Sequence, residues 1–159
     1  MDDLRKTILL ELLDEAFDRT AWHGPNLRGS IRGLDADRVS WRPHPDRKNI
    51  AEQVLHAAYW KYTVRRRLRG GKRGSFPLKG SNWFPVQDPL DEAGWRGHVR
   101  LLDEEHRALR LAVVKFPEAR WLEKPGGGKY TYHESVKGIA NHDVYHAGQI
   151  QLLKRLRSG

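Results

Sequence analysis

Cysteine is absent from the chain, and its absence excludes several kinds of chemistry. Without a thiol the protein has no disulfide, no thiolate metal ligand and no cysteine nucleophile. A tight metal site would therefore have to use histidine, aspartate or glutamate side chains.

The chain also lacks long apolar runs. No stretch approaches the roughly twenty consecutive apolar residues that a membrane-spanning helix needs. The first residues, Met1-Asp2-Asp3-Leu4, are acidic and lack the basic and apolar regions of a signal peptide. We therefore expect a cytoplasmic protein without a membrane partner.

The length and charge of the chain narrow its class. The 159 residues, 38% of them hydrophobic and 31% charged, suit one domain that spans residues 1–159. Subtracting 20 Asp and Glu from 29 Lys and Arg leaves a net charge of +9. This excess favours anionic partners, although a basic solvated surface is its more ordinary explanation. Nucleic acid is therefore the less favoured partner.

Four stretches of the chain carry apolar residues at helical spacing. The first covers Ile8–Phe17, the second follows Asn49, the third runs from Asp88-Pro89 to Pro117, and the fourth runs from Thr131 to about Arg157. No stretch has the alternation of a strand. The pattern predicts an all-α fold, a four-helix bundle.

Local signals predict where three of these helices begin. Asn49 with Glu52, and Thr131 with Glu134, have the spacing of a capping box. Pro89 is predicted to occupy the first position of the third helix, where its missing N–H costs nothing.

The connection between the second and third helices is long. Residues 71–88 include Phe76, Trp83 and Phe84, which predict that the segment packs against the helices. A connection of this length can link two parallel helices, whereas antiparallel neighbours need only a short loop. We therefore predict a long crossover between helices two and three.

Two histidines lie on the apolar face of the predicted last helix. Spacings of three and four residues place Ile139, His142, His146, Ile150 and Leu153 on this one face. Buried imidazoles need partners for both ring nitrogens. A pair at i and i+4 can direct its nitrogens at one metal ion. Hydrogen-bonded core histidines are the alternative interpretation.

His56 is a third candidate ligand. It lies about one and a half turns into the predicted second helix, a depth that matches His142 and His146 if helices two and four begin at the same end of the bundle. Three imidazoles would leave an open position on the metal, as catalytic sites do. His106, on the core face of the third helix, is a rival for a place near the site.

Other catalytic patterns are missing. The segment His142–His146 reads His-Asp-Val-Tyr-His and lacks the general-base glutamate of the His-Glu-x-x-His motif. The chain has no Gly-x-Ser-x-Gly elbow and no phosphate-binding loop. The run of glycines at 126–128 is predicted to be a plain loop.

Taken together, these residues resemble a known family. His56 within Ile-Ala-Glu-Gln-Val-Leu-His-Ala-Ala, followed by His142-x-x-x-His146-x-Gly-Gln-Ile, is similar to the DinB-like, or bacillithiol-transferase-like (YfiT-like), superfamily. The resemblance covers nearly the whole chain, with further similar segments at 22–27, 41–43, 59–62 and 82–85.

The resemblance implies a four-helix bundle, often dimeric, that holds a divalent metal. The metal would be zinc or nickel, and its ligands would correspond to His56, His142 and His146. Relatives with known activity transfer low-molecular-weight thiols, and some are induced by DNA damage. We therefore rank a metal-dependent thiol transferase of stress response or detoxification first. A metal-dependent hydrolase at the same site is second, and a non-catalytic stress-associated binding protein is third.

Further residues are candidates for contact with a thiol or an electrophile. They are Gln149 as a catalytic hydrogen-bonding group, Lys61, Arg65 and Arg66 as partners for substrate carboxylates, and Tyr59 and Trp60 as pocket walls. The ordinary interpretations are a solvated helix end for the cations and a core position for the aromatics.

Overall fold

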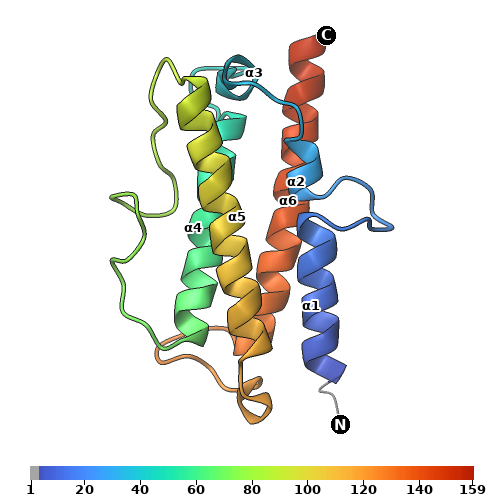
Figure 1. The fold of residues 1–159 in the computed structure, drawn as a ribbon, viewed down its shortest axis with the longest axis vertical. Coiled ribbons are helices and arrows are strands. Elements are labelled where there is room, and N and C mark those ends of the chain that lie inside the picture. The colour runs from blue at the N-terminus through green and yellow to red at the C-terminus, as the bar shows by residue number, and fades with distance from the viewer. Residues whose placement is uncertain (1–3) are drawn as a thin grey trace.

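Helices alone make up the regular structure of the computed structural model, which describes residues 4–159. The elements are α1 (Leu4–Phe17), α2 (Leu27–Ser30), α3 (Ala36–Ser40), α4 (Ile50–Leu68), α5 (Glu92–Val114), a 3-10 turn (Glu118–Arg120) and α6 (Tyr132–Ser158). The predicted all-α class is confirmed, with α1, α4, α5 and α6 as the four long helices (Figure 1). Within the described range no helix combines the length and apolar character that a membrane crossing requires.

Side chains outside the helices determine where two of them begin. At α4 the Asn49 side chain accepts a hydrogen bond from the Glu52 backbone N–H, and Glu52 accepts one from the Asn49 backbone. Thr131 and Glu134 make the same reciprocal pair at α6. Both predicted capping boxes are confirmed, and they satisfy backbone donors that a helix start leaves without partners.

The third long helix begins later than predicted. Asp91, and not Asp88, is its N-cap, because the Asp91 side chain accepts a hydrogen bond of 2.7 Å from the backbone N–H of Gly94. Glu92 in the first turn also accepts from the backbone of Ala36 at 2.7 Å, which ties the start of α5 to the start of α3. The Asp91 cap and the tertiary contact of the neighbouring Glu92 together outweigh the preference of proline for a helix start.

The long helices run in two parallel pairs. In Figure 1, α1 and α6 ascend, whereas α4 and α5 descend. The segment between Leu68 and Glu92 returns along the outside of the bundle to connect α4 with the parallel helix α5. The predicted crossover is confirmed. Since α4 and α6 are antiparallel, they do not begin at the same end, and the condition under which the depths of the three histidines were compared is not met.

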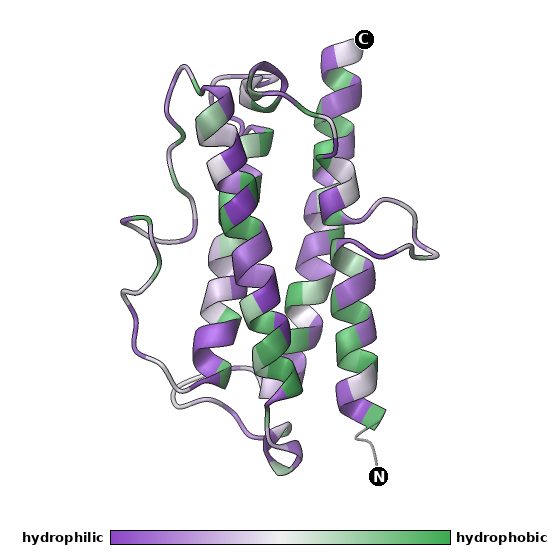
Figure 2. Ribbon diagram, in the orientation of Figure 1, coloured by the Kyte–Doolittle hydropathy of each residue, from purple (hydrophilic) through white to green (hydrophobic). Residues whose placement is uncertain are grey.

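The core consists of two apolar clusters, one toward each end of the bundle. The first joins the start of α4 to the end of α6, through residues such as Val54 and Ile150. The second joins the end of α4 to the start of α6, through residues such as Val64 and Ile139. Figure 2 shows the corresponding alternation of hydrophobic and hydrophilic residues along each long helix. Between the clusters, buried polar residues from α4, α5 and α6 meet at the middle of the bundle.

Candidate metal centre

Three histidines from two antiparallel helices converge at the middle of the bundle. His56 comes from α4, and His142 and His146 come from α6. The Nε2 atom of His142 lies 3.1 Å from the Nε2 of His56 and 3.1 Å from the Nε2 of His146. Their candidate ligand atoms all lie within 4.8 Å of one another. The length of α6 brings the two helices into register here, because its middle faces the first half of α4.

Hydrogen bonds to the outer ring nitrogens determine which nitrogen carries the proton. The Nδ1 of His56 lies 2.8 Å from the backbone carbonyl oxygen of Asn82, and the Nδ1 of His146 lies 3.1 Å from the side-chain oxygen of Gln53. Oxygens of this kind only accept, so each Nδ1 must donate. In the neutral rings both Nε2 atoms therefore present lone pairs toward His142.

The imidazole of His142 alone does not satisfy the Nε2 lone pairs of both His56 and His146. His142 can donate a single N–H from Nε2, and its Nδ1 is buried without a partner among the described residues. A divalent cation would satisfy all three Nε2 lone pairs at once. Ligands of a tetrahedral zinc at about 2.05 Å are separated by roughly 3.3 Å, close to the observed spacing. The donor set therefore fits a divalent metal, and the outer hydrogen bonds match the supporting contacts of metal-bound histidines.

Burial keeps the cluster uncharged at neutral pH. Burial, followed by the neighbouring imidazoles of His146 and His56, lowers the pKa of His142 to about 3. Burial and then the neighbouring His56 lower the pKa of His146 to about 4, and a hydrogen bond that His146 donates to Gln149 partly opposes this decrease. Burial also lowers the pKa of His56. Neutral imidazoles are the form that binds a cation.

The crossover segment contributes the wall around His56. Asn82 has a φ of 65°, a left-handed conformation that asparagine tolerates better than most residues. Its backbone oxygen thereby meets His56 while its side-chain oxygen accepts from the indole N–H of Trp60 at 3.0 Å. The next residue, Trp83, stacks on the His56 ring with centroids 3.9 Å apart and planes 11° apart. The prediction that this segment packs against the bundle is confirmed.

A cavity of about 820 Å³ opens beside the three histidines. Its lining includes the three histidines, Gln53, Trp60, Asn82, Trp83, Tyr145, Gln149, Arg47 and Lys48. Of the predicted contact residues, Gln149 and Trp60 therefore reach this cavity. The Gln149 side-chain amide donates to the Tyr145 hydroxyl at 2.9 Å, so it lies on the exposed side of the histidines.

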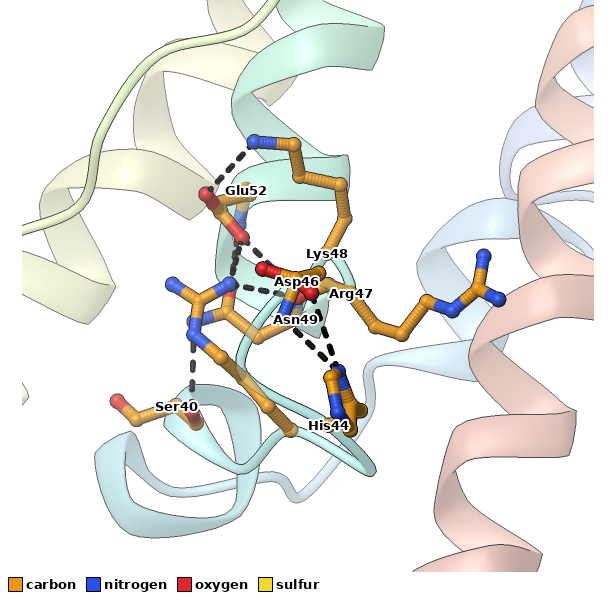
Figure 3. A network of polar contacts seen from close by, with 8 residues as sticks. Ser40, His44, Asp46, Arg47, Lys48, Asn49 and Glu52 are labelled. Carbon is orange, nitrogen blue, oxygen red and sulfur yellow. Dashed lines mark hydrogen bonds and ion pairs between the residues drawn. The ribbon is translucent and has the colours of Figure 1, made fainter.

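A loop before α4 brings two cations to this cavity (Figure 3). Its backbone is held by the Arg42 guanidinium, which donates to the Arg47 carbonyl at 2.8 Å. Lys48 pairs with Glu52 at 3.3 Å and lies over the Trp83 ring. The Arg47 side chain extends away from this network toward α6, and its guanidinium has no hydrogen bond or ion pair to any described residue. A rigid loop thus presents a free cation at the cavity.

Four other predicted contact residues do not line this cavity. Lys61 is fully buried and ion-paired with Asp143, and Arg65 makes two hydrogen bonds of 2.9 and 3.1 Å to Glu105. Both belong to α4 positions that face α5 and the core, so neither reaches substrate in the cavity. Arg66 donates to the Gly71 carbonyl, and it lines a different cavity together with Tyr59.

A second buried polar cluster lies beside the histidines. Lys61 contacts the Nδ1 of His106 at 3.3 Å as well as Asp143, and His106 stacks on Phe17 with centroids 3.6 Å apart. Burial raises the pKa of Asp143 to about 6, although Lys61 opposes the rise. Burial, and then the Lys61 charge, lower the pKa of His106 to about 2. His106 is therefore part of this cluster and not of the metal centre.

Five residues at the site were not predicted from the sequence to contact a metal or a substrate. They are Gln53, Asn82, Trp83, Arg47 and Lys48. Gln53 lies three residues before His56, so the helical period signals that it shares a face with the ligand. The position of Arg47 and Lys48 just before the N-cap Asn49 places them near the same end of α4 as His56. Asn82 and Trp83 reach the site only through the crossover, which helical periodicity does not locate.

Comparison with known proteins gives one match. The family model described as DinB superfamily matches residues 11–150, most of the chain. The matched range includes all three histidines of the cluster. The searches of curated proteins and of solved structures found no match.

Proposed function

We propose a metal-dependent thiol-transfer activity for the chain, which belongs to the DinB superfamily. Its substrates would be a low-molecular-weight thiol and an electrophile, as in a detoxification reaction. The observation that carries the proposal is the combination of three neutral imidazoles with an adjoining cavity that has almost no carboxylate.

The scarcity of carboxylates favours a thiol over water as the nucleophile. Among the described residues that line the cavity, Asp46 is the single carboxylate, and it is exposed and paired at 3.6 Å with His44. Water has a pKa near 16, and even where a bound metal lowers it to about 7, hydrolases of this kind usually add a general base such as the glutamate of His-Glu-x-x-His. A thiol has a pKa near 8.5 and needs only a modest decrease. A site without a base therefore suits a thiol better.

Different residues of the chain would bind the metal, cover His56 and bind the substrate. His56, His142 and His146 would hold zinc or nickel, which when bound supplies the positive charge that lowers the pKa of a nearby thiol. Trp83 covers His56 and limits the access of water to it. Gln149 lines the cavity and would donate a hydrogen bond to substrate through the amide hydrogen that Tyr145 does not accept.

Arg47 and Lys48 are our candidates for binding the anionic end of the thiol. Biological low-molecular-weight thiols commonly carry carboxylates, and a free guanidinium binds a carboxylate with two parallel hydrogen bonds. We therefore assign the binding of substrate carboxylates, which the sequence suggested for Lys61 and Arg65, to the loop before α4.

The test has two stages. Elemental analysis of tag-free protein should find about one divalent ion per chain in the wild type and none in His146→Ala. The loaded wild type should then consume chlorodinitrobenzene only when a thiol is present, and His146→Ala should lose this activity. His133→Ala, on the same helix but outside the cluster, should behave like the wild type.

Other results would redirect the assignment. Turnover that needs water but no thiol would indicate a hydrolase. A wild type that fails to take up zinc or nickel would overturn the metalloenzyme proposal and favour a non-catalytic binding protein. The homodimer and the cytoplasmic location stay predictions.

A further inference from the structure

We propose that a second cavity, which adjoins the metal centre, binds the electrophile and that the electrophile is an apolar, aromatic-sized molecule. This inference rests on the proposed thiol transfer, because a transferase must bring two different substrates to one place. The first cavity, with Arg47 and Lys48, would then be left to the anionic thiol.

The second cavity has a volume of about 660 Å³ and lies between the end of α4 and the start of α6. Two residues, Trp60 and His142, line both this cavity and the one beside the histidines. A molecule in either cavity can therefore contact the same imidazole and the same indole ring. The hydrogen bond from Trp60 to Asn82 holds that ring in place at the boundary.

The walls of the second cavity are suited to an aromatic ring. Trp60, Val64, Ile139 and Tyr130 supply apolar and aromatic surface. Flat aromatic surfaces of this kind favour ring-shaped ligands through stacking and burial.

The rim adds a preference for electron-withdrawing substituents. Arg67, Lys129 and Lys137 lie around the opening, against one carboxylate, Glu134, which the capping box at α6 already uses. Nitro or carboxyl oxygens on the ring would meet this positive charge. Such substituents also make an aromatic carbon a better electrophile.

The transfer itself balances without another reactant. With chlorodinitrobenzene as the electrophile, the thiol proton goes to solvent and the sulfur electron pair forms a bond to the ring carbon. The carbon–chlorine bond breaks, and chloride leaves with its electron pair. The sulfur and the ring carbon must meet near His142, which both cavities share.

A glycine allows the second cavity to be filled with little disturbance of the helix. Gly138 lines the cavity, is exposed on α6, and a Cβ built on it meets no atom within 4 Å. Gly138→Phe should therefore fold and occupy the cavity, whereas Gly138→Ala leaves most of the space open. Gly97→Phe on α5 is the matched control, because Gly97 also has open space at its Cβ and lines neither cavity.

The decisive measurement is binding, which does not depend on turnover. Zinc-loaded protein is titrated with meta-dinitrobenzene, which has no chloride to lose, and backbone amide shifts are followed by NMR. We expect shifts at Gly127, Gly128 and Gly138 in the wild type and in Gly97→Phe, and shifts at Gly127 and Gly128 in Gly138→Ala. Gly138→Phe should weaken binding by about ten-fold or more. Shifts confined to Arg47, Lys48 and Gln149, unchanged binding by Gly138→Phe, or no binding at all would overturn the inference.

Steady-state kinetics provide a second test and separate the two proposals. Gly138→Phe should raise the KM for chlorodinitrobenzene by about ten-fold and leave the KM for the thiol near its wild-type value. An equal rise in both KM values would overturn the assignment of separate cavities. Binding of meta-dinitrobenzene in the second cavity without any thiol-dependent turnover would reject the proposed function and leave the binding site established.

Discussion

Two buried polar clusters lie side by side at the middle of the bundle, and they differ in whether they contain groups of opposite charge that pair with one another. In the cluster of Lys61, Asp143 and His106, a cation meets an anion, and the lysine and carboxylate are both fully buried. In the cluster of His56, His142 and His146, three neutral rings direct Nε2 atoms at one point. His142 of α6 belongs to the histidine cluster, and the next residue, Asp143, belongs to the ion-pair cluster.

The difference separates a structural role from a ligand-binding role. The ion pair neutralises its own charges and joins α4 to α6, and one buried oxygen of Asp143, Oδ1, has no hydrogen-bond partner among the described residues. The histidine cluster has lone pairs that its own protons do not satisfy, so it is complete only with a cation. Burial of polar groups is therefore a weak guide to function, whereas unsatisfied groups that converge are a strong one.

The largest expected effect comes from breaking the ion pair. Asp143→Ala leaves the Lys61 ammonium buried without its partner and should lower the free energy of unfolding by about 3–5 kcal/mol. Urea denaturation in the presence of a chelator measures this loss without any contribution from metal.

The double variant Lys61→Met/Asp143→Leu and a surface pair serve as controls. The double variant should recover much of the lost stability, because it removes both charges. Asp37→Ala breaks the exposed pair with Arg157 and should cost no more than about 1 kcal/mol. An Asp143→Ala variant as stable as the wild type would contradict the structural role.

The next effect is the stabilisation by metal. Zinc at about one hundred times its dissociation constant should raise the unfolding free energy of the wild type by about 2.7 kcal/mol. His142→Ala should lose this zinc-dependent gain, because one of the three ligands is missing. Thermal denaturation with and without zinc checks the difference, and a full gain in His142→Ala would count against the centre.

A smaller effect is expected from a residue that only orients a ligand. Gln53→Leu removes the acceptor of the His146 Nδ1 proton and should weaken zinc binding about ten- to one hundred-fold. Competition with a chromophoric chelator measures the affinity. The elemental ratio at saturating zinc should stay near one per chain, which distinguishes Gln53 from a ligand; unchanged affinity would exclude its orienting role.

The last effect, which is small for each pH unit, concerns pH and the ion-pair cluster. The folded pKa of His106, about 2, lies below its ordinary value of 6.5, so the native state binds fewer protons than the unfolded state. Its contribution to stability is complete above pH 6.5 and is lost as the pH falls toward 2.

His106→Phe tests this contribution because it keeps an aromatic ring beside Phe17 but cannot titrate. Between pH 6 and pH 4, the slope of unfolding free energy against pH should fall by up to about 1.4 kcal/mol per pH unit. Urea denaturation over this range in the presence of a chelator gives the slope. Equal slopes in the wild type and the variant would show that His106 titrates normally.

Much of the fold could be predicted because its signals are local. The capping boxes at Asn49 and Thr131 and the apolar stripe of α6 depend on spacings within one or two turns. The start of α5 was missed because Asp91 competes with Pro89, and a contact between Glu92 and Ala36, far away in the chain, favours the later start. Lys61 was misplaced because its sequence neighbours resemble an exposed helix end, whereas its partner Asp143 comes from another helix.

The sequence by itself determined the helices, the absence of thiol ligands and the three histidines, since residue type and helical period are properties of the chain. The tertiary structure decided which partners these residues meet. Antiparallel packing of α4 on α6 brings His56 to His142, and the crossover carries Asn82 and Trp83 back onto His56. These contacts join residues 26 to 86 positions apart. Nothing in local spacing encodes such distances, because they follow from how the helices bury their apolar faces against one another.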